Sequence, residues 1–125
     1  MSKKILIVED DTFLANTLSE YLKDEGFNVH LAENGLEGFD MCKKHKPDLI
    51  VCDINMPKMD GLTMLKKIRS NDWGKKLRIL MLTNYSDEDK VLEALKNSVF
   101  NYLIKSDWEL EAVVAKIKEQ INKSV

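Results

Sequence analysis

Residues 47–61, Pro-Asp-Leu-Ile-Val-Cys-Asp-Ile-Asn-Met-Pro-Lys-Met-Asp-Gly, hold the pattern that decides the fold. Four apolar residues, Leu49 to Cys52, run without interruption, which is typical of a strand covered on both faces. Asp53 follows directly, and a loop with proline and glycine comes next. Ile5 to Val8 form a similar apolar run that ends in three acidic residues. The two segments predict neighbouring buried strands of a parallel sheet.

Outward from these strands, short apolar runs alternate with longer amphipathic segments. Further strands are expected at 28–31, 77–82 and 99–104. Helices are expected at 12–25 and 34–45, and after the N-caps Asp60, Ser86 and Ser106. The alternation predicts an α/β fold with a doubly wound, five-stranded parallel sheet in the flavodoxin-like order 2-1-3-4-5. One domain over residues 1–125 accommodates this (βα)5 arrangement.

The composition excludes several classes of protein. The chain is 44% hydrophobic and 32% charged with few glycines and prolines, as in folded globular domains. Nineteen basic residues against 21 acidic ones leave a net charge of -2, so nothing favours nucleic acid or anionic membranes in general. No apolar run approaches the ~20 residues of a membrane span. Cys42 and Cys52 lack metal-ligand spacing, and a reducing cytoplasm is expected.

Polar residues follow the predicted strands at the carboxyl edge of the sheet, where such folds bind ligands. They are Glu9, Asp10 and Asp11 after the first strand, Asp53 after the third, Thr83 and Asn84 after the fourth, and Lys105 and Ser106 after the fifth. Carboxylates ~4 Å apart repel by roughly 4 kcal/mol per pair at an effective dielectric of about 20, so a bound cation, a raised pKa or Lys105 must offset the repulsion. Oxygen ligands alone suit Mg2+. The set fits phosphoryl transfer to Asp53 as nucleophile, assisted by Thr83 and Lys105.

Each of these residues also has a purely structural interpretation. Asp11 could cap the next helix, and Asp53 could be a turn residue. Lys105 could be solvated, and Thr83 could pack through its methyl group. Their joint occurrence at the correct strand ends favours a shared site over independent structural roles.

The chain resembles the receiver domains of two-component response regulators, including the chemotaxis regulators, over essentially its whole length. The matching stretches are residues 5–11, 47–61, 79–83 and 102–105. The resemblance implies phosphoryl transfer to Asp53 from a histidine kinase or phosphotransfer protein. The metal ligands it implies, for Mg2+ or Mn2+, are Asp10, Asp53 and the main-chain carbonyl of Asn55, with Glu9 acting through water. It also makes Thr83 and Tyr102 a switch pair. The surface of the fourth helix, fifth strand and fifth helix would then signal a downstream partner or a missing output domain.

Four positions depart from the family pattern. Ser106 stands where a proline usually follows the lysine, which leaves a cis bond after Lys105 an open expectation. Asn84 replaces a small residue and is expected to slow small phosphodonors or hydrolytic water. Phe100 and Asn101 stand where the DNA-binding subgroup carries acidic residues, which argues against that subgroup's dimer.

We therefore expect a cytoplasmic switch that catalyses only its own phosphorylation and dephosphorylation, not an enzyme acting on other substrates. Direct binding to nucleic acid or membrane is not expected. An aspartate-nucleophile phosphohydrolase would need a second carboxylate where Asn55 stands, and a flavodoxin-like cofactor binder would need a phosphate loop in place of residues 9–11. A receiver-like interaction module that works without phosphorylation stays open because of Asn84 and Ser106.

Overall fold

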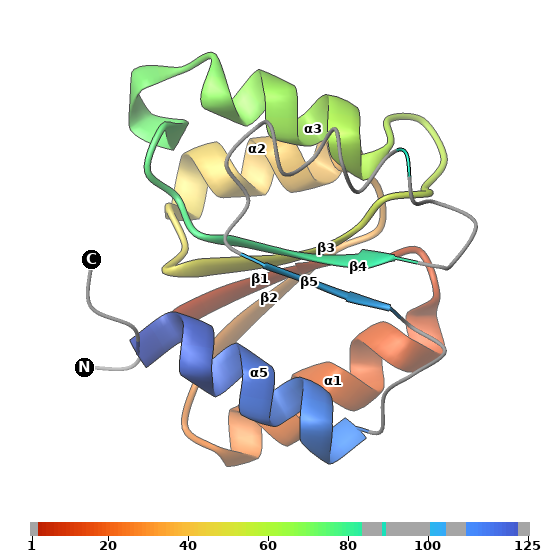
Figure 1. Ribbon diagram of the computed structural model, residues 1–125, viewed down its shortest axis with the longest axis vertical. Coiled ribbons are helices and arrows are strands. Elements are labelled where there is room, and N and C mark those ends of the chain that lie inside the picture. Colours follow the sequence, from red (N-terminus) through yellow and green to blue (C-terminus); the bar gives the residue numbers. More distant parts are fainter. Residues whose placement is uncertain (1–2, 84–88, 90–100, 105–109, 123–125) are drawn as a thin grey trace.

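A parallel sheet lies between two layers of helices (Figure 1). The computed structural model describes residues 3–83, 89, 101–104 and 110–122. Its strands are β1 (Lys4–Val8), β2 (Asn28–Ala32), β3 (Leu49–Asp53), β4 (Ile79–Thr83) and β5 (Asn101–Ile104). They pair in parallel in the order β2-β1-β3-β4-β5, which is the predicted order.

Helices α1 (Thr12–Asp24) and α5 (Leu110–Asn122) cover one face of the sheet (Figure 1). Helices α2 (Gly35–His45) and α3 (Gly61–Arg69) cover the other face, followed by a short 3-10 helix, η1 (Asp72–Gly74). The predicted helix after Ser86 and the predicted strand residues 99–100 lie outside the described residues.

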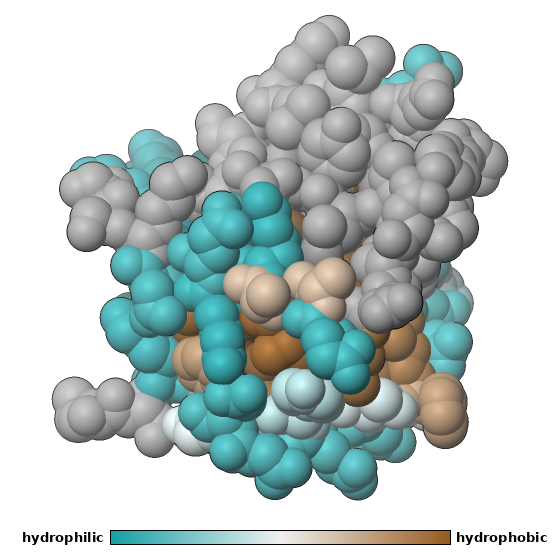
Figure 2. All heavy atoms as spheres, turned by 60° about the horizontal axis from the view of Figure 1, so that its bottom comes forward, coloured by the Kyte–Doolittle hydropathy of each residue, from teal (hydrophilic) through white to brown (hydrophobic). Residues whose placement is uncertain are grey.

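The two faces of the sheet bury two separate apolar cores. Because successive strand residues point to opposite faces, Ile5 and Ile7 pack with α1 and α5, whereas Leu6 and Val8 pack with α2 and α3. This double burial explains the uninterrupted apolar run of β1. On the outer side of the α1–α5 layer, hydrophilic residues cover most of the described surface, with apolar residues between them (Figure 2). Among the described residues, no helix is long and apolar enough to cross a membrane.

The helix ends follow the predicted capping residues. The side chains of Asp11, Asn34 and Asp60 accept backbone hydrogen bonds at the starts of α1, α2 and α3, at 3.1, 2.9 and 2.7 Å. Gly26, just after α1, has φ +96, a left-handed conformation that favours glycine. These local signals fix where the helices begin relative to the strand ends.

The predicted start of the fourth strand differs from the structure. The fourth strand begins at Ile79 and not at residue 77, and Arg78 sends its side chain to the end of α5. Its Nη1 donates to the carbonyls of Gln120 at 2.9 Å and Ile121 at 3.2 Å. Residues 71–76, between α3 and β4, contain η1, whose glycine packs closely against the Ile68 carbonyl.

Candidate functional site

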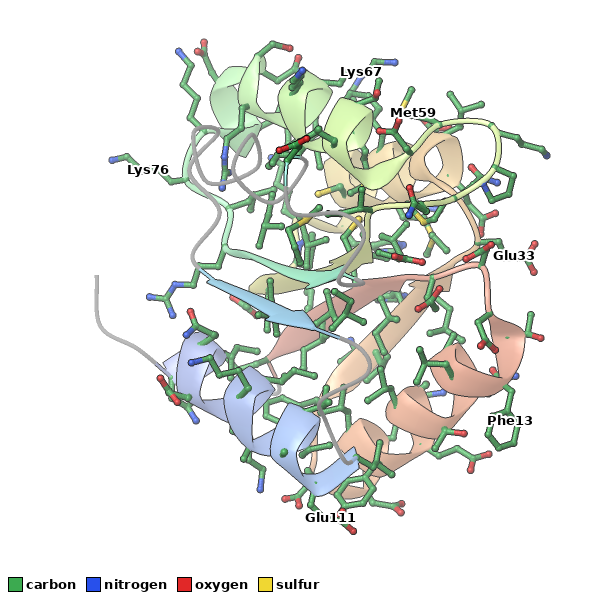
Figure 3. All side chains as sticks on the ribbon, turned by 45° about the vertical axis from the view of Figure 1, so that its right-hand side comes forward. Phe13, Glu33, Met59, Lys67, Lys76 and Glu111 are labelled. Carbon is green, nitrogen blue, oxygen red and sulfur yellow. The ribbon has the colours of Figure 1, made fainter. Side chains whose placement is uncertain are left out.

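Three carboxylates meet where β1 and β3 end. Glu9 and Asp10 follow β1, and Asp53 is the last residue of the neighbouring β3. One carboxylate oxygen from each residue lies within 4.8 Å of the other two. The prediction that the sheet brings these residues together is therefore confirmed. In Figures 1 and 3 this edge is on the right, where the strands run into the starts of α1 and α3.

The cluster is buried on one side and open on the other. Glu9 is 1% and Asp53 4% exposed, whereas Asp10 is exposed. Three charges at this spacing repel one another, and a buried setting weakens the screening by water. The donors are oxygens alone, which fits Mg2+ or Mn2+ better than zinc or copper. The residues present can therefore hold a hard divalent cation, with Asp10 on the side open to solvent.

Backbone contacts hold the β1 end of the cluster in place. The Glu9 amide donates to the Ala32 carbonyl of β2 at 3.0 Å, and the Asp11 amide donates to Glu9 Oε2 at 3.3 Å. Asp11 itself caps α1 through Leu14, so the structural interpretation of this residue is confirmed. The acidic triplet thus divides into two residues of the cluster and one helix cap.

Asp53 is positioned by the start of α3. A Cβ on Gly61 would lie 2.0 Å from the Asp53 carbonyl oxygen, so no side chain fits there. The Gly61 amide donates to the Ile54 carbonyl at 2.8 Å, which folds the loop back over the end of β3. The Cys52 thiol donates to the Asp53 carbonyl at 3.0 Å. Gly61 is part of the motif at residues 47–61, but its close approach to the Asp53 carbonyl becomes visible only in the folded structure.

The loop between β3 and α3 also contacts α2. The Gly35 amide donates to the Met59 carbonyl at 2.9 Å, and a Cβ on Gly35 would lie 2.4 Å from that oxygen. Lys58 has φ 66, a left-handed conformation that is uncommon for a residue with a side chain. Asn55 is exposed in this loop, two residues after Asp53, and its main-chain role toward a metal stays a prediction.

The two buried cysteines contribute no thiolate to the site. Burial, followed by the negative charges of Asp53, Glu9 and Asp60, raises the pKa of the Cys52 thiol well above its ordinary value. Burial likewise raises the pKa of the Cys42 thiol to about 12. Both are free thiols that stay protonated at neutral pH.

The remaining predicted site residues are placed only by their backbone or not at all. Asp53 pairs with Leu82 across the β3–β4 ladder, and Thr83 follows as the last residue of β4. Tyr102 lies in β5 and pairs with Met81. The side chains of Thr83 and Tyr102 are outside the described part of the chain, as are all of Asn84, Lys105 and Ser106.

Comparison with known proteins agrees with this arrangement. A sequence model of the family described as "Response regulator receiver domain" matches residues 5–118. The chemotaxis protein CheY of Bacillus subtilis is 36% identical, with the match covering 90% of this chain and 96% of CheY. The probable transcriptional regulator ycf29 of Porphyra purpurea is 39% identical over 97% of this chain. The match spans only 57% of ycf29, and 22% of the regulator ZraR of Klebsiella oxytoca.

Solved structures of similar proteins have the same fold. A putative response regulator from Chloroflexus aurantiacus superposes with a TM-score of 0.88 at 31% identity, covering 98% of this chain and 100% of that one. The receiver domain of the sensor histidine kinase PA1611 from Pseudomonas aeruginosa superposes with a TM-score of 0.86 at 22% identity, over 98% and 100%. That structure has a magnesium ion coordinated in its active-site cleft. With the family match and the CheY relative taken together, this chain belongs to the receiver domains of two-component response regulators.

Proposed function

We propose that this receiver domain is a phosphoacceptor switch that takes a phosphoryl group on Asp53. One observation carries the proposal: the carboxylates of Glu9, Asp10 and Asp53 converge within 4.8 Å at the carboxyl edge of the sheet. A lone aspartate at a strand end would have no such neighbours. The complete (βα)5 flavodoxin-like arrangement, with a helix between β4 and β5, is part of the same proposal.

We propose Mg2+, or Mn2+, as the cofactor of this site. Its ligands would be Asp10, Asp53 and the main-chain carbonyl of Asn55, with Glu9 acting through water. The all-oxygen cluster supports the proposal, and the magnesium ion of the PA1611 receiver domain shows that this fold accommodates one. When bound, a divalent cation neutralises charge on the carboxylates and on the phosphoryl oxygens.

In the proposed reaction, an Asp53 carboxylate oxygen attacks the phosphorus of a phosphohistidine or a small phosphodonor. A new phosphorus–oxygen bond forms, the bond to the donor nitrogen or oxygen breaks, and the leaving group carries away the bonding electron pair. The hydroxyl of Thr83 and the ammonium of Lys105 would stabilise the phosphoryl oxygens. The product is an acyl phosphate on the protein itself, which water later hydrolyses. The chain would therefore transform no external substrate.

The proposed partners are a histidine kinase or phosphotransfer protein upstream and a protein or output domain downstream. Phe13 is 82% exposed, three residues after Asp10, and points away from the sheet at the same edge as the acidic cluster (Figure 3). An exposed aromatic beside the reacting residues suits contact with a protein donor. The added charge would bias Thr83, Tyr102 and the surface of the proposed fourth helix, β5 and α5 toward a second conformation. The free, buried thiols are consistent with a cytoplasmic location.

Intact-protein mass spectrometry tests the phosphoacceptor. The chain, its Asp53→Asn variant and its Asp60→Asn variant are incubated with phosphoramidate or acetyl phosphate and Mg2+. Asp60 is the matched control, since it caps α3 and asparagine also caps helices well. A gain of about 80 Da is expected in the wild type and Asp60→Asn, but not in Asp53→Asn or with a chelator.

Two results would contradict this function. The first is an equal gain in Asp53→Asn, which would place the phosphoryl group elsewhere. The second is no gain in the wild type with small donors and with a panel of phosphorylated histidine kinases. That outcome would favour an interaction module that works without phosphorylation.

A further inference from the structure

Two histidines stack at the opposite end of the molecule from the acidic cluster. The rings of His30 and His45 lie with centroids 4.1 Å apart and planes 13° from parallel. His30 belongs to the edge strand β2, and His45 is the last residue of α2. Both are partly exposed to solvent. Because α2 runs back from the carboxyl edge, its last turn lies at the amino edge of the sheet.

Three lysines, from β1, α2 and α1, contribute positive charge that acts on His30. Lys4, at the start of β1, donates from Nζ to the His45 carbonyl at 3.2 Å. Lys44 precedes His45 in α2, and Lys23 lies in the last turn of α1. Burial, and then the charges of His45, Lys4, Lys23 and Lys44, lower the pKa of His30. The charges that lower this pKa are all positive.

The positive charge has little local compensation among the described residues. Neither Lys23 nor Lys44 makes an ion pair within that part of the chain. The carboxylate of Asp48 accepts a hydrogen bond from the Lys4 backbone amide at 2.8 Å. The carbonyl end of α2 explains basic residues within that helix. The carbonyl end of α1 accounts for Lys23 in the same way, whereas no helix end accounts for Lys4 of β1 and His30 of β2.

We propose that Lys4, Lys23, His30, Lys44 and His45, here called the basal cluster, bind a multivalent phosphate-type anion. The lysines offer charge, and the partly exposed imidazoles offer donors from their ring nitrogens once protonated. Stacked imidazolium rings repel each other, and a shared anion removes that repulsion. The ligand is a free polyphosphate or a phosphate-bearing lipid headgroup, which present the same chemistry.

Anion binding at the basal cluster is linked to proton uptake. A bound anion favours the charged form of His30 and opposes the effect of the lysines, so the pKa of His30 rises on binding. By the same linkage, affinity increases as the pH falls from about 7 to about 6. This linkage separates a defined site from diffuse attraction to scattered surface lysines. It is also independent of Asp53 chemistry.

Histidine NMR titrations of the full chain test the proposal, in EDTA so that metal at the acidic cluster plays no part. Pyrophosphate is compared with sodium chloride at equal ionic strength. Pyrophosphate is expected to raise the pKa of His30 by about one unit, the order expected for an opposite charge within ~4–6 Å. Lys23→Gln/Lys44→Gln should lose most of this rise. Lys75→Gln/Lys76→Gln, with the same change of net charge at two exposed lysines, should keep it.

The outcomes separate the alternatives. An equal rise in all three proteins would overturn the proposal. In a second arm, phosphatidylcholine vesicles with and without phosphatidic acid replace pyrophosphate. A rise with pyrophosphate alone identifies a free anion as the ligand, and a rise that needs phosphatidic acid identifies a lipid headgroup. No rise in either arm leaves the basal cluster without a ligand of this class and refutes the proposal.

Discussion

In the absence of divalent cations, Asp53→Asn is expected to stabilise the protein. The oxygens of Glu9, Asp10 and Asp53 lie within 4.8 Å of one another. At that distance a pair of charges repels by about 0.9 kcal/mol at the dielectric of water and about 3.5 kcal/mol at an effective dielectric of about 20. Asparagine removes two of the three repulsions at nearly unchanged size. The stabilisation should therefore fall between about 2 and about 7 kcal/mol, with the exposure of Asp10 favouring the lower end.

Urea unfolding followed by circular dichroism measures this difference in EDTA and in excess Mg2+. Saturating Mg2+ at about 100 times its Kd should stabilise the wild type by about 2.7 kcal/mol. It should stabilise Asp53→Asn much less, so the gap between the two proteins narrows or reverses. Asp60→Asn is the control, because it removes a nearby charge outside the cluster and keeps the α3 cap.

Two results would refute this reasoning. One is an Asp53→Asn variant no more stable than the wild type in EDTA, which would mean that the carboxylate charges do not repel in the folded state. The other is equal stabilisation of both proteins by Mg2+, which would place the cation away from Asp53.

Three further predictions concern positions around the site and the two helix layers. Gly61→Ala should cost about 1–3 kcal/mol of stability and abolish phosphorylation in the mass spectrometry assay, because its Cβ would lie 2.0 Å from the Asp53 carbonyl oxygen. Gly74→Ala is the control: its Cβ would lie 2.2 Å from the Ile68 carbonyl oxygen, far from Asp53, so it should cost stability and keep phosphorylation. The pKa of His30 is lowered in the folded state, so the unfolded chain binds the proton more readily, and the wild type should lose stability as the pH falls below about 6.5. Urea titrations at pH about 7 and about 5 should show a smaller loss in His30→Asn. Arg78→Met should cost about 1.5–3 kcal/mol in urea unfolding through its lost bonds to the end of α5, and an unchanged midpoint would contradict that role.

The strands and their order could be predicted because the local signals agree with the tertiary contacts. Ile5 to Val8 are apolar without interruption, and the sheet buries all four on its two faces. Asp11, Asn34 and Asp60 cap the helices they precede. The start of the fourth strand was predicted two residues too early, at 77 in place of 79. Arg78 bonds to the carbonyl of a residue 42 positions away, and no local pattern places it before the strand.

The acidic cluster could also be predicted, because the ends of neighbouring parallel strands must lie close together. The role of Gly61 could not be predicted, because the clash that a Cβ at this position would make with the Asp53 carbonyl depends on how α3 packs against the end of β3. The basal cluster could not be predicted from the sequence for a similar reason. A net charge of -2 gave no sign of it, because its five residues lie in four elements between positions 4 and 45.

The most direct test of the central claim is to trap the acyl phosphate chemically and locate it. The chain is phosphorylated with phosphoramidate and Mg2+, reduced with borohydride and digested, and the peptide that contains residue 53 is sequenced by mass spectrometry. Borohydride reduces an aspartyl phosphate to homoserine and leaves an unmodified carboxylate intact. The account predicts homoserine at position 53 and aspartate at positions 10 and 60. Homoserine at another position, with aspartate retained at 53, would contradict it.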